Sequence, residues 1–93
     1  MITVVIPALL QDLTANREQV EVEVAAGETL TVREVLARLE KRFPGLEERL
    51  LDGEALTPGL AVFIDGEQAG LRLQARVKAG ATVFFLAPIA GGR

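Results

Sequence analysis

The sequence predicts a single α+β domain in which one main helix packs on one face of a mixed sheet. Two observations carry this prediction. Only one segment, residues 31–43, has strong helical spacing of apolar residues, and a single helix cannot cover both faces of a sheet. The first and last apolar runs, residues 2–6 and 82–86, are the most uniformly apolar, which favours central, adjacent and parallel strands. A length of 93 residues suits one modest core.

The N-terminal part predicts a β-hairpin. Residues 2–6 are β-branched throughout and predict a strand that Pro7 ends. Residues 12–17 are polar and contain Asn16, a turn candidate. Residues 20–24 alternate valine and glutamate, which predicts a half-exposed strand with the valines directed inward. Because the two runs are close in sequence, we expect them to pair antiparallel.

The helix is the best-marked element. Thr31 is a favourable N-cap, and Glu34, three residues later, completes a capping box. Leu30 and Val35 occupy the two positions of a hydrophobic staple. Pro44-Gly45 ends the helix. The residues at helical spacing on its apolar face are Val32, Val35, Leu36, Leu39 and Phe43.

The C-terminal half predicts two more strands. Residues 46–51 predict one further helical turn, and residues 61–64 predict a strand that a hairpin-type turn, Asp65-Gly66, follows. Residues 71–77 are ambiguous between a strand and an irregular segment, and residues 82–86 predict the last strand. Further turns are expected at Asp52-Gly53, Thr57-Pro58-Gly59 and Ala79-Gly80.

The composition argues against several classes of function. The net charge of −3 argues against nucleic-acid binding, which needs a basic patch. Without Cys there is no thiolate metal site or cysteine nucleophile, and without His the usual general base near neutral pH is missing. We therefore expect no metal site and regard an enzyme as the least favoured class. No apolar run approaches a membrane span and no signal peptide is recognised, so we expect a cytoplasmic protein without membrane contacts.

Strand alternation leaves an excess of apolar side chains. If the helix packs against one face of the sheet, Val5, Phe63, Phe84 and Leu86 must point to the other face, with Pro7 nearby. Two explanations remain open: the cluster is a docking patch for a partner, or a loop from residues 46–60 folds over it. The residues expected to face the helix are Ile2, Val4, Ile6, Val62, Ile64, Val83 and Phe85.

The C-terminal tail also has two explanations. Pro88 should end the last strand, and the residues after it, among them Gly91 and Gly92, are too small to bury themselves. Such a tail is either a frayed, solubilising end or a substrate whose slim backbone enters a narrow channel and places its terminal carboxylate next to ATP. We therefore expect a domain over residues 1–87 and a flexible tail over residues 88–93.

The chain resembles the MoaD/ThiS ubiquitin-like sulfur carriers, which include the small subunit of molybdopterin synthase and the carrier for thiocarboxylate-dependent cysteine synthesis. Three features carry the resemblance: the β-β-α-β-β order, the apolar strand end at residues 84–88, and the segment Pro88-Ile89-Ala90-Gly91-Gly92. The resemblance extends over the whole chain and implies a β-grasp, ubiquitin-like fold.

The resemblance also implies a mechanism. An E1-like enzyme would adenylate the carboxylate of Gly92, and a sulfur donor would convert it to a thiocarboxylate that donates sulfur to a synthase. Gly91 would keep the tail slim in the channel of the partner. The chain would be a carrier or co-substrate, or the small subunit of such a synthase, and would bind no cofactor itself because the activating enzyme supplies ATP and Mg²⁺. The partner-binding residues would be Val5, Pro7, Phe63, Phe84, Leu86 and Pro88.

One departure from the family pattern is Arg93, which follows the glycine pair. A Gly92 carboxyl group held in a peptide bond cannot be adenylated. We favour removal of Arg93 by a peptidase, over an artefact of the sequence or a loss of carrier activity. Two other functions stay open: a protein modifier joined to lysines of its targets, and a noncovalent interaction module with an inert tail. The pathway that receives the sulfur is also open.

Overall fold

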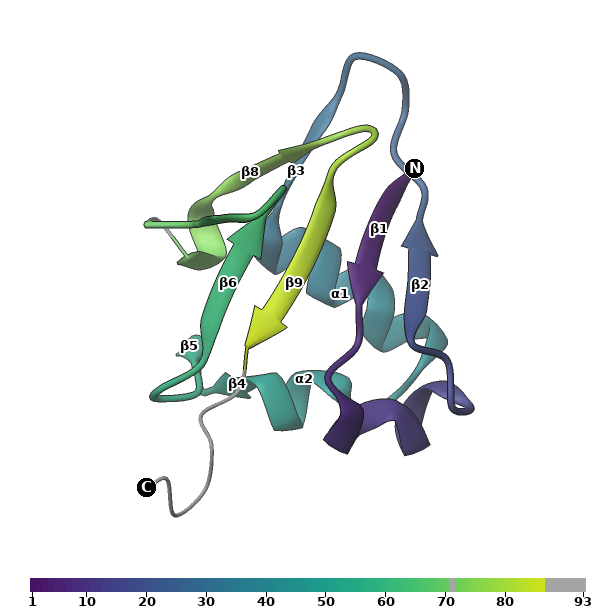
Figure 1. The fold of residues 1–93 in the computed structure, drawn as a ribbon, viewed down its shortest axis with the longest axis vertical. Helices are drawn as coiled ribbons and strands as arrows, with labels where there is room; N and C mark the ends of the chain where they lie inside the picture. Colours follow the sequence, from purple (N-terminus) through teal and green to yellow (C-terminus); the bar gives the residue numbers. More distant parts are fainter. Residues whose placement is uncertain (71, 87–93) are drawn as a thin grey trace.

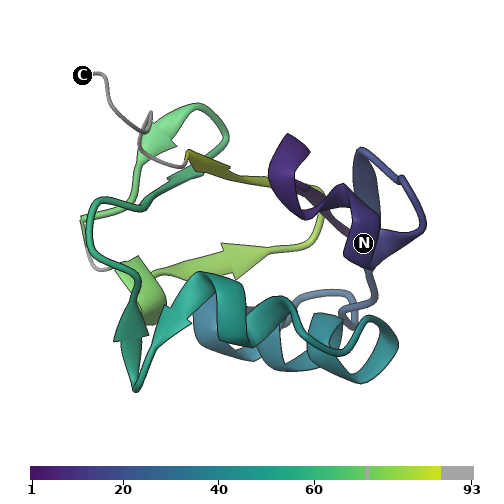
Figure 2. The ribbon, with the colours of Figure 1, turned by 90° about the horizontal axis from the view of Figure 1, so that it is seen from below.

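The computed structural model describes residues 1–70 and 72–86, apart from the side chain of Leu9. The tail over residues 88–93 and the last residue of the expected domain, Ala87, lie outside the described residues. A five-stranded mixed sheet forms one layer, and the two α-helices form the other (Figures 1 and 2). This is the two-layer α+β arrangement that the sequence predicts and the β-grasp fold that the resemblance implies, with α1 (Val32–Arg42) as the main helix.

The sheet has the strand order β2-β1-β9-β6-β7. Strand β1 (Ile2–Val5) pairs antiparallel with β2 (Gln19–Val22) and parallel with β9 (Thr82–Leu86). Strand β9 pairs antiparallel with β6 (Ala61–Ile64), which pairs in turn with the short β7 (Glu67–Gln68). The first and last strands are therefore central, adjacent and parallel, as their apolar sequences predict (Figure 1).

Helix α1 begins at the predicted capping box. The N–H of Glu34 donates to the hydroxyl of Thr31 at 3.1 Å, and the N–H of Thr31 donates to the Glu34 carboxylate at 2.8 Å. These bonds satisfy backbone donors that lack partners within the helix. The helix ends at Arg42, next to Pro44-Gly45, and Gly45 has a φ of 107° that favours glycine.

Several short elements were not predicted from the sequence. They include a 3-10 helix η1 (Ala8–Thr14), a strand pair β3 (Thr29–Thr31) with β8 (Arg76–Lys78), and a hairpin β4 (Leu51–Asp52) with β5 (Ala55–Leu56). The ambiguous segment contains a second 3-10 helix, η2 (Arg72–Gln74), before β8. Strands of two or three residues are too short to show periodicity. The β3–β8 pair joins distant segments, whereas β4 and β5 form a local hairpin.

The core lies between α1 and the sheet. The inward residues of the three inner strands, such as Val4, Val62 and Phe85, are at most 2% exposed. Ile64 was expected among them but is only half-buried, because β6 ends there and the turn follows. The predicted extra helical turn is α2 (Leu46–Leu50). The buried side chains from residues 46–60 are Leu46, Leu50, Leu56 and Leu60.

The suggestion that residues 46–60 cover the opposite face of the sheet is wrong. Helix α2 packs against α1 and η1, and its buried leucines belong to the same core as the helix-facing strand residues. Figure 2 shows both α-helices on the same side of the sheet.

Within the described part of the chain, no helix has the length and apolar character needed to cross a membrane.

Candidate functional site

The outer face of the sheet carries an exposed apolar cluster. Phe84 and Leu86 are 40% and 50% exposed. Phe85, which lies between them, and Val83, which precedes Phe84, are nearly fully buried. This contrast follows from strand alternation, because β9 is central and only one of its faces meets α1. One face of strand β9 therefore packs in the core, and the other face leaves large apolar side chains exposed.

A row of three side chains crosses this face. Phe84 is the register partner of Val5 on β1 and of Phe63 on β6. The rings of Phe63 and Phe84 meet edge to face, with centroids 6.4 Å apart and an interplanar angle of 69°. Such geometry favours aromatic pairs and restrains both rings. We call Val5, Phe63, Phe84 and Leu86 the open-face patch.

Four of the six predicted partner-binding residues thus come together. Val5 and Phe63 are half-buried, and Phe84 and Leu86 are exposed. Pro7 is half-buried and lies two residues after the end of β1, where it precedes η1. Pro88 lies outside the described residues. The structure places these side chains on one face, while their role in binding stays a prediction.

A shallow hollow of about 340 Å³ lies on this patch, lined by Phe63, Gly66, Thr82, Phe84 and Leu86. Gly66 and Thr82 were not predicted as site residues. Gly66 belongs to the β6–β7 turn, where Asp65 and Gly66 have φ values of 52° and 86°, and Thr82 is the first residue of β9. The N–H of Thr82 donates to the Asp65 carboxylate at 2.9 Å, and the N–H of Asp65 donates to the carbonyl of Thr82 at 2.9 Å. The Asp-Gly turn signal could have pointed to Gly66.

The four side chains of the open-face patch are all apolar. Among the described residues that line the hollow, none has an ionisable side chain. Within residues 1–70 and 72–86, no cluster of acidic side chains is arranged to hold a metal ion. An apolar surface of this kind recognises the apolar surface of another molecule.

The patch lies next to the C-terminal segment in sequence. Strand β9 ends at Leu86, one of the patch residues, and residues 87–93 follow directly. The predicted reactive residues, Gly91 and Gly92, and the following Arg93 lie outside the described residues. Their predicted chemistry is therefore not tested by the structure.

The ThiS family matches residues 4–92 of the chain. Among solved structures, a chain of the BexX/CysO complex of Amycolatopsis orientalis is 34% identical, with a TM-score of 0.85 over 99% of this chain and 100% of that one. CysO of Mycobacterium tuberculosis is 25% identical, with a TM-score of 0.77 over 96% of this chain and 100% of that one. SAMP1 of Haloferax volcanii is 27% identical, with a TM-score of 0.77 over 98% of both chains. No curated protein sequence matches the chain significantly.

Proposed function

The chain belongs to the ThiS family, and from this premise we propose that it is a sulfur carrier whose Gly92 carboxyl group becomes a thiocarboxylate. The observation that carries the proposal is the position of the open-face patch. A central strand ends inside the patch at Leu86 and leads directly into the segment that contains Gly91-Gly92. A partner that holds the patch would therefore have the glycine pair within reach. The family match also runs through Gly92 and stops before Arg93.

The proposed chemistry has three steps. A peptidase hydrolyses the Gly92–Arg93 peptide bond, which adds water and leaves a free Gly92 carboxylate. A carboxylate oxygen then attacks the α-phosphorus of ATP, and pyrophosphate leaves, which gives the acyl-adenylate. Hydrosulfide delivered by a sulfur donor attacks the acyl carbon, AMP leaves with its bridging oxygen, and loss of the sulfur-bound proton gives the thiocarboxylate. Adenylation is needed because a carboxylate is a poor electrophile, and the partner contributes the orientation of the reactants.

The chain itself contributes binding and a slim tail rather than catalysis. Its sequence contains neither Cys nor His, so the activating enzyme would provide ATP, Mg²⁺ and any acid or base. The patch would orient the domain on that enzyme, and Gly91 would let the backbone approach the nucleotide closely because it has no side chain. In this scheme the protein is a co-substrate of its partners.

The proposed partners are an E1-like adenylating enzyme, a sulfur-accepting synthase and a peptidase that removes Arg93. The similarity to a chain of the BexX/CysO complex supports partner proteins in general. The patch supports the same conclusion, because an exposed cluster of aromatic and aliphatic side chains typically marks a protein-binding surface. The pathway that would use the sulfur, whether for molybdopterin, cysteine or another product, is not part of the proposal.

The absence of Cys makes a specific test possible. We would isolate the chain from its native cells, measure its intact mass, and treat it with iodoacetamide. A chain that ends at Gly92 as a thiocarboxylate carries sulfur in place of one oxygen and forms one alkyl adduct. No cysteine can give this adduct, because the sequence contains none. The matched control is a chain without Gly91 and Gly92, which should give no adduct. A single unmodified species that retains Arg93 would contradict the proposal.

A second candidate function is a protein modifier. Its support is the similarity to Haloferax volcanii small archaeal modifier protein 1, which is 26% identical with a TM-score of 0.77 over 95% of this chain and 97% of that one. A modifier would be found with Gly92 in an isopeptide bond to a lysine of another protein. The same purification distinguishes the two, because a conjugate has a larger mass and yields a branched peptide after proteolysis.

A further inference from the structure

Strand β2 lies at one edge of the sheet. Among residues 1–70 and 72–86, which the structure describes, β1 is the one strand that pairs with it in the order β2-β1-β9-β6-β7. The N–H of Ile6 donates to the carbonyl of Glu18 at 2.8 Å, so the even-numbered residues of this segment bond inward to β1. Antiparallel alternation then directs the backbone groups of Gln19, Glu21 and Glu23 away from the sheet. An edge of this kind can pair with another chain unless something occupies it.

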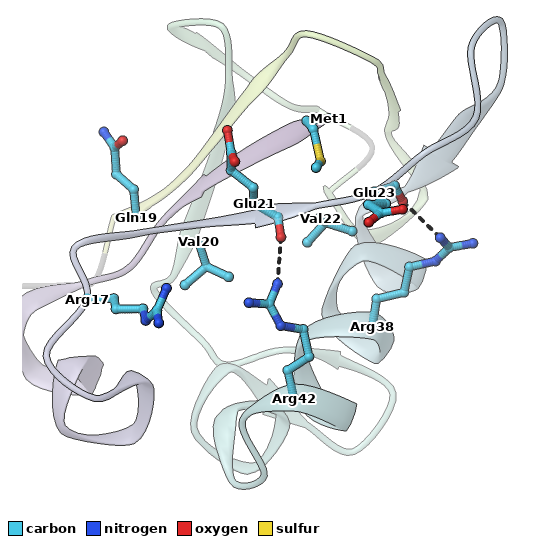
Figure 3. A pocket seen from close by; sticks show the side chains of 9 residues that line it. All are labelled: Met1, Arg17, Gln19, Val20, Glu21, Val22, Glu23, Arg38 and Arg42. Carbon is cyan, nitrogen blue, oxygen red and sulfur yellow. Dashed lines mark hydrogen bonds between the residues drawn. The ribbon is translucent and has the colours of Figure 1, made fainter.

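Two arginines of α1 occupy this edge. Arg42 donates to the carbonyl of Glu21 at 2.7 Å, and Arg38 donates to the carbonyl of Glu23 at 2.9 Å (Figure 3). The spacing of the two arginines along the helix matches the spacing of the two carbonyls along the strand, because four helical residues rise about 6 Å and two strand residues about 6.6 Å. The helix therefore presents guanidinium groups in register with the outward carbonyls of β2.

A third arginine extends the basic side of the hollow that Figure 3 shows. Arg17 lies with Arg38 and Arg42 on one side of β2, whereas the side chains of Gln19 and Glu21 point to the other side. The backbone of Arg17 is fixed by the buried hydroxyl of Thr14, which donates to its carbonyl at 3.0 Å. The hollow between strand and helix, about 690 Å³ in volume, is lined by these three arginines and also by Glu21 and Glu23, in a chain whose net charge is −3.

We propose that the β2 edge is a second protein-binding surface, which takes an extended acidic segment of a partner as an added strand. Backbone N–H groups of that segment would replace the guanidinium groups on the carbonyls of Glu21 and Glu23. The released Arg38 and Arg42 would pair with carboxylates two residues apart on the side of the segment that faces α1. Arg17 would meet a further carboxylate. Main-chain bonds give affinity in such a complex, and the matched charges select the sequence.

Replacing the arginine–carbonyl bonds with backbone bonds and arginine–carboxylate pairs is energetically favourable. Both arginine–carbonyl bonds are exposed, so a backbone donor replaces each with little loss. A guanidinium binds a carboxylate more strongly than a neutral carbonyl, since the bond is charge-assisted and can be bidentate. The patch residues Phe63, Phe84 and Leu86 lie on β6 and β9 and Val5 lies on β1, whereas the outward backbone groups of the proposed surface belong to β2. The inference goes beyond the proposed function and does not depend on the chemistry of Gly92.

The test uses a fluorescein-labelled peptide of alternating Glu and Val residues and a matched peptide of alternating Gln and Val. We expect the Glu peptide to bind and the Gln peptide to bind more weakly, with an affinity that falls as salt is added. Amide chemical shifts should change for residues 19–23, and the N–H groups of Gln19 and Glu21 should become protected from hydrogen exchange. Lack of binding, or shift changes confined to the open-face patch, would overturn the proposal.

Arginine variants give the decisive comparison. Arg38→Gln and Arg42→Gln should each weaken binding of the Glu peptide by up to about fivefold, and the double variant by more. Arg33→Gln, on the same helix with the same change of charge, should leave binding unchanged. If the arginines only guard the edge, their removal would instead strengthen peptide binding or cause dimers in sedimentation experiments, and either result overturns the proposal. The single variants keep the test open if the double variant unfolds.

Discussion

At the scale of single residues, Phe84 and Phe85 show how neighbouring identical side chains take opposite roles. Phe85 is 2% exposed in the core, and Phe84 is 40% exposed on the open-face patch. We predict that Phe85→Ala lowers the free energy of unfolding by about 3–5 kcal/mol, because it leaves a cavity. Phe84→Ala should cost only about 1 kcal/mol, chiefly its contact with Phe63. Urea unfolding of the two variants checks this, and equal losses would contradict the assignment of faces.

Glu40 predicts a pH dependence of stability. Its carboxylate accepts the N–H of Glu47 at 2.9 Å and of Gly45 at 3.0 Å, and these bonds lower the pKa of Glu40 below 4.5. A carboxyl group whose pKa is lower in the folded state stabilises the protein above the unfolded value. That contribution is lost as the pH falls below 4.5 through the folded pKa.

The measurement compares the native chain with Glu40→Gln in urea at neutral pH and well below pH 4.5. The native chain should lose more stability on acidification than the variant, because the amide of the variant does not titrate. Glu48→Gln is the matched control, since Glu48 is an exposed neighbour on α2. A loss on acidification that is the same in all three chains would show that the bonds of Glu40 do not contribute.

At the scale of elements, the capping box of α1 is the clearest link between sequence and stability. Thr31→Ala removes the hydroxyl that accepts the N–H of Glu34. We predict a loss of about 1 kcal/mol in the free energy of unfolding, because one backbone donor at the start of the helix loses its partner. Thr31→Ser keeps the hydroxyl and should retain most of the stability. Thermal unfolding followed by circular dichroism measures both, and a serine variant as unstable as the alanine variant would contradict the capping role.

At the scale of the whole molecule, the open-face patch and the core are separate layers, so binding and stability can be changed independently. We predict that Leu86→Asp weakens engagement of the activating enzyme by about tenfold or more, because it places a charge in an apolar interface. Its unfolding free energy should change little, since Leu86 is 50% exposed. Ala79→Asp, an exposed change in a turn, is the control. ATP–pyrophosphate exchange over a range of carrier concentrations measures the effect, and unchanged exchange would contradict the role of the patch.

Much of this architecture could be predicted from the sequence. The alternation in residues 20–24, the capping box at Thr31 and the turn at Asp65-Gly66 are local signals, and the structure contains a strand, a helix start and a hairpin turn at these places. The parallel pairing of the two most apolar strands was also predicted. The elements that were missed, η1 and the two short strand pairs, have no periodicity of their own. Strands β3 and β8 pair because Leu30 meets Val77 from a distant part of the chain, whereas Leu51 meets Leu56 within a local hairpin.

The sequence by itself determined the fold class, the main helix and the side chains that share each face of a strand, because these follow from periods of two and 3.6 residues along the chain. It also determined that the four patch residues would point away from the helix. Only the tertiary structure decided that residues 46–60 join the core and leave this patch open, and that Arg38 and Arg42 meet the carbonyls of β2. Both outcomes depend on contacts between distant segments, and no local period encodes which distant surface a segment will meet.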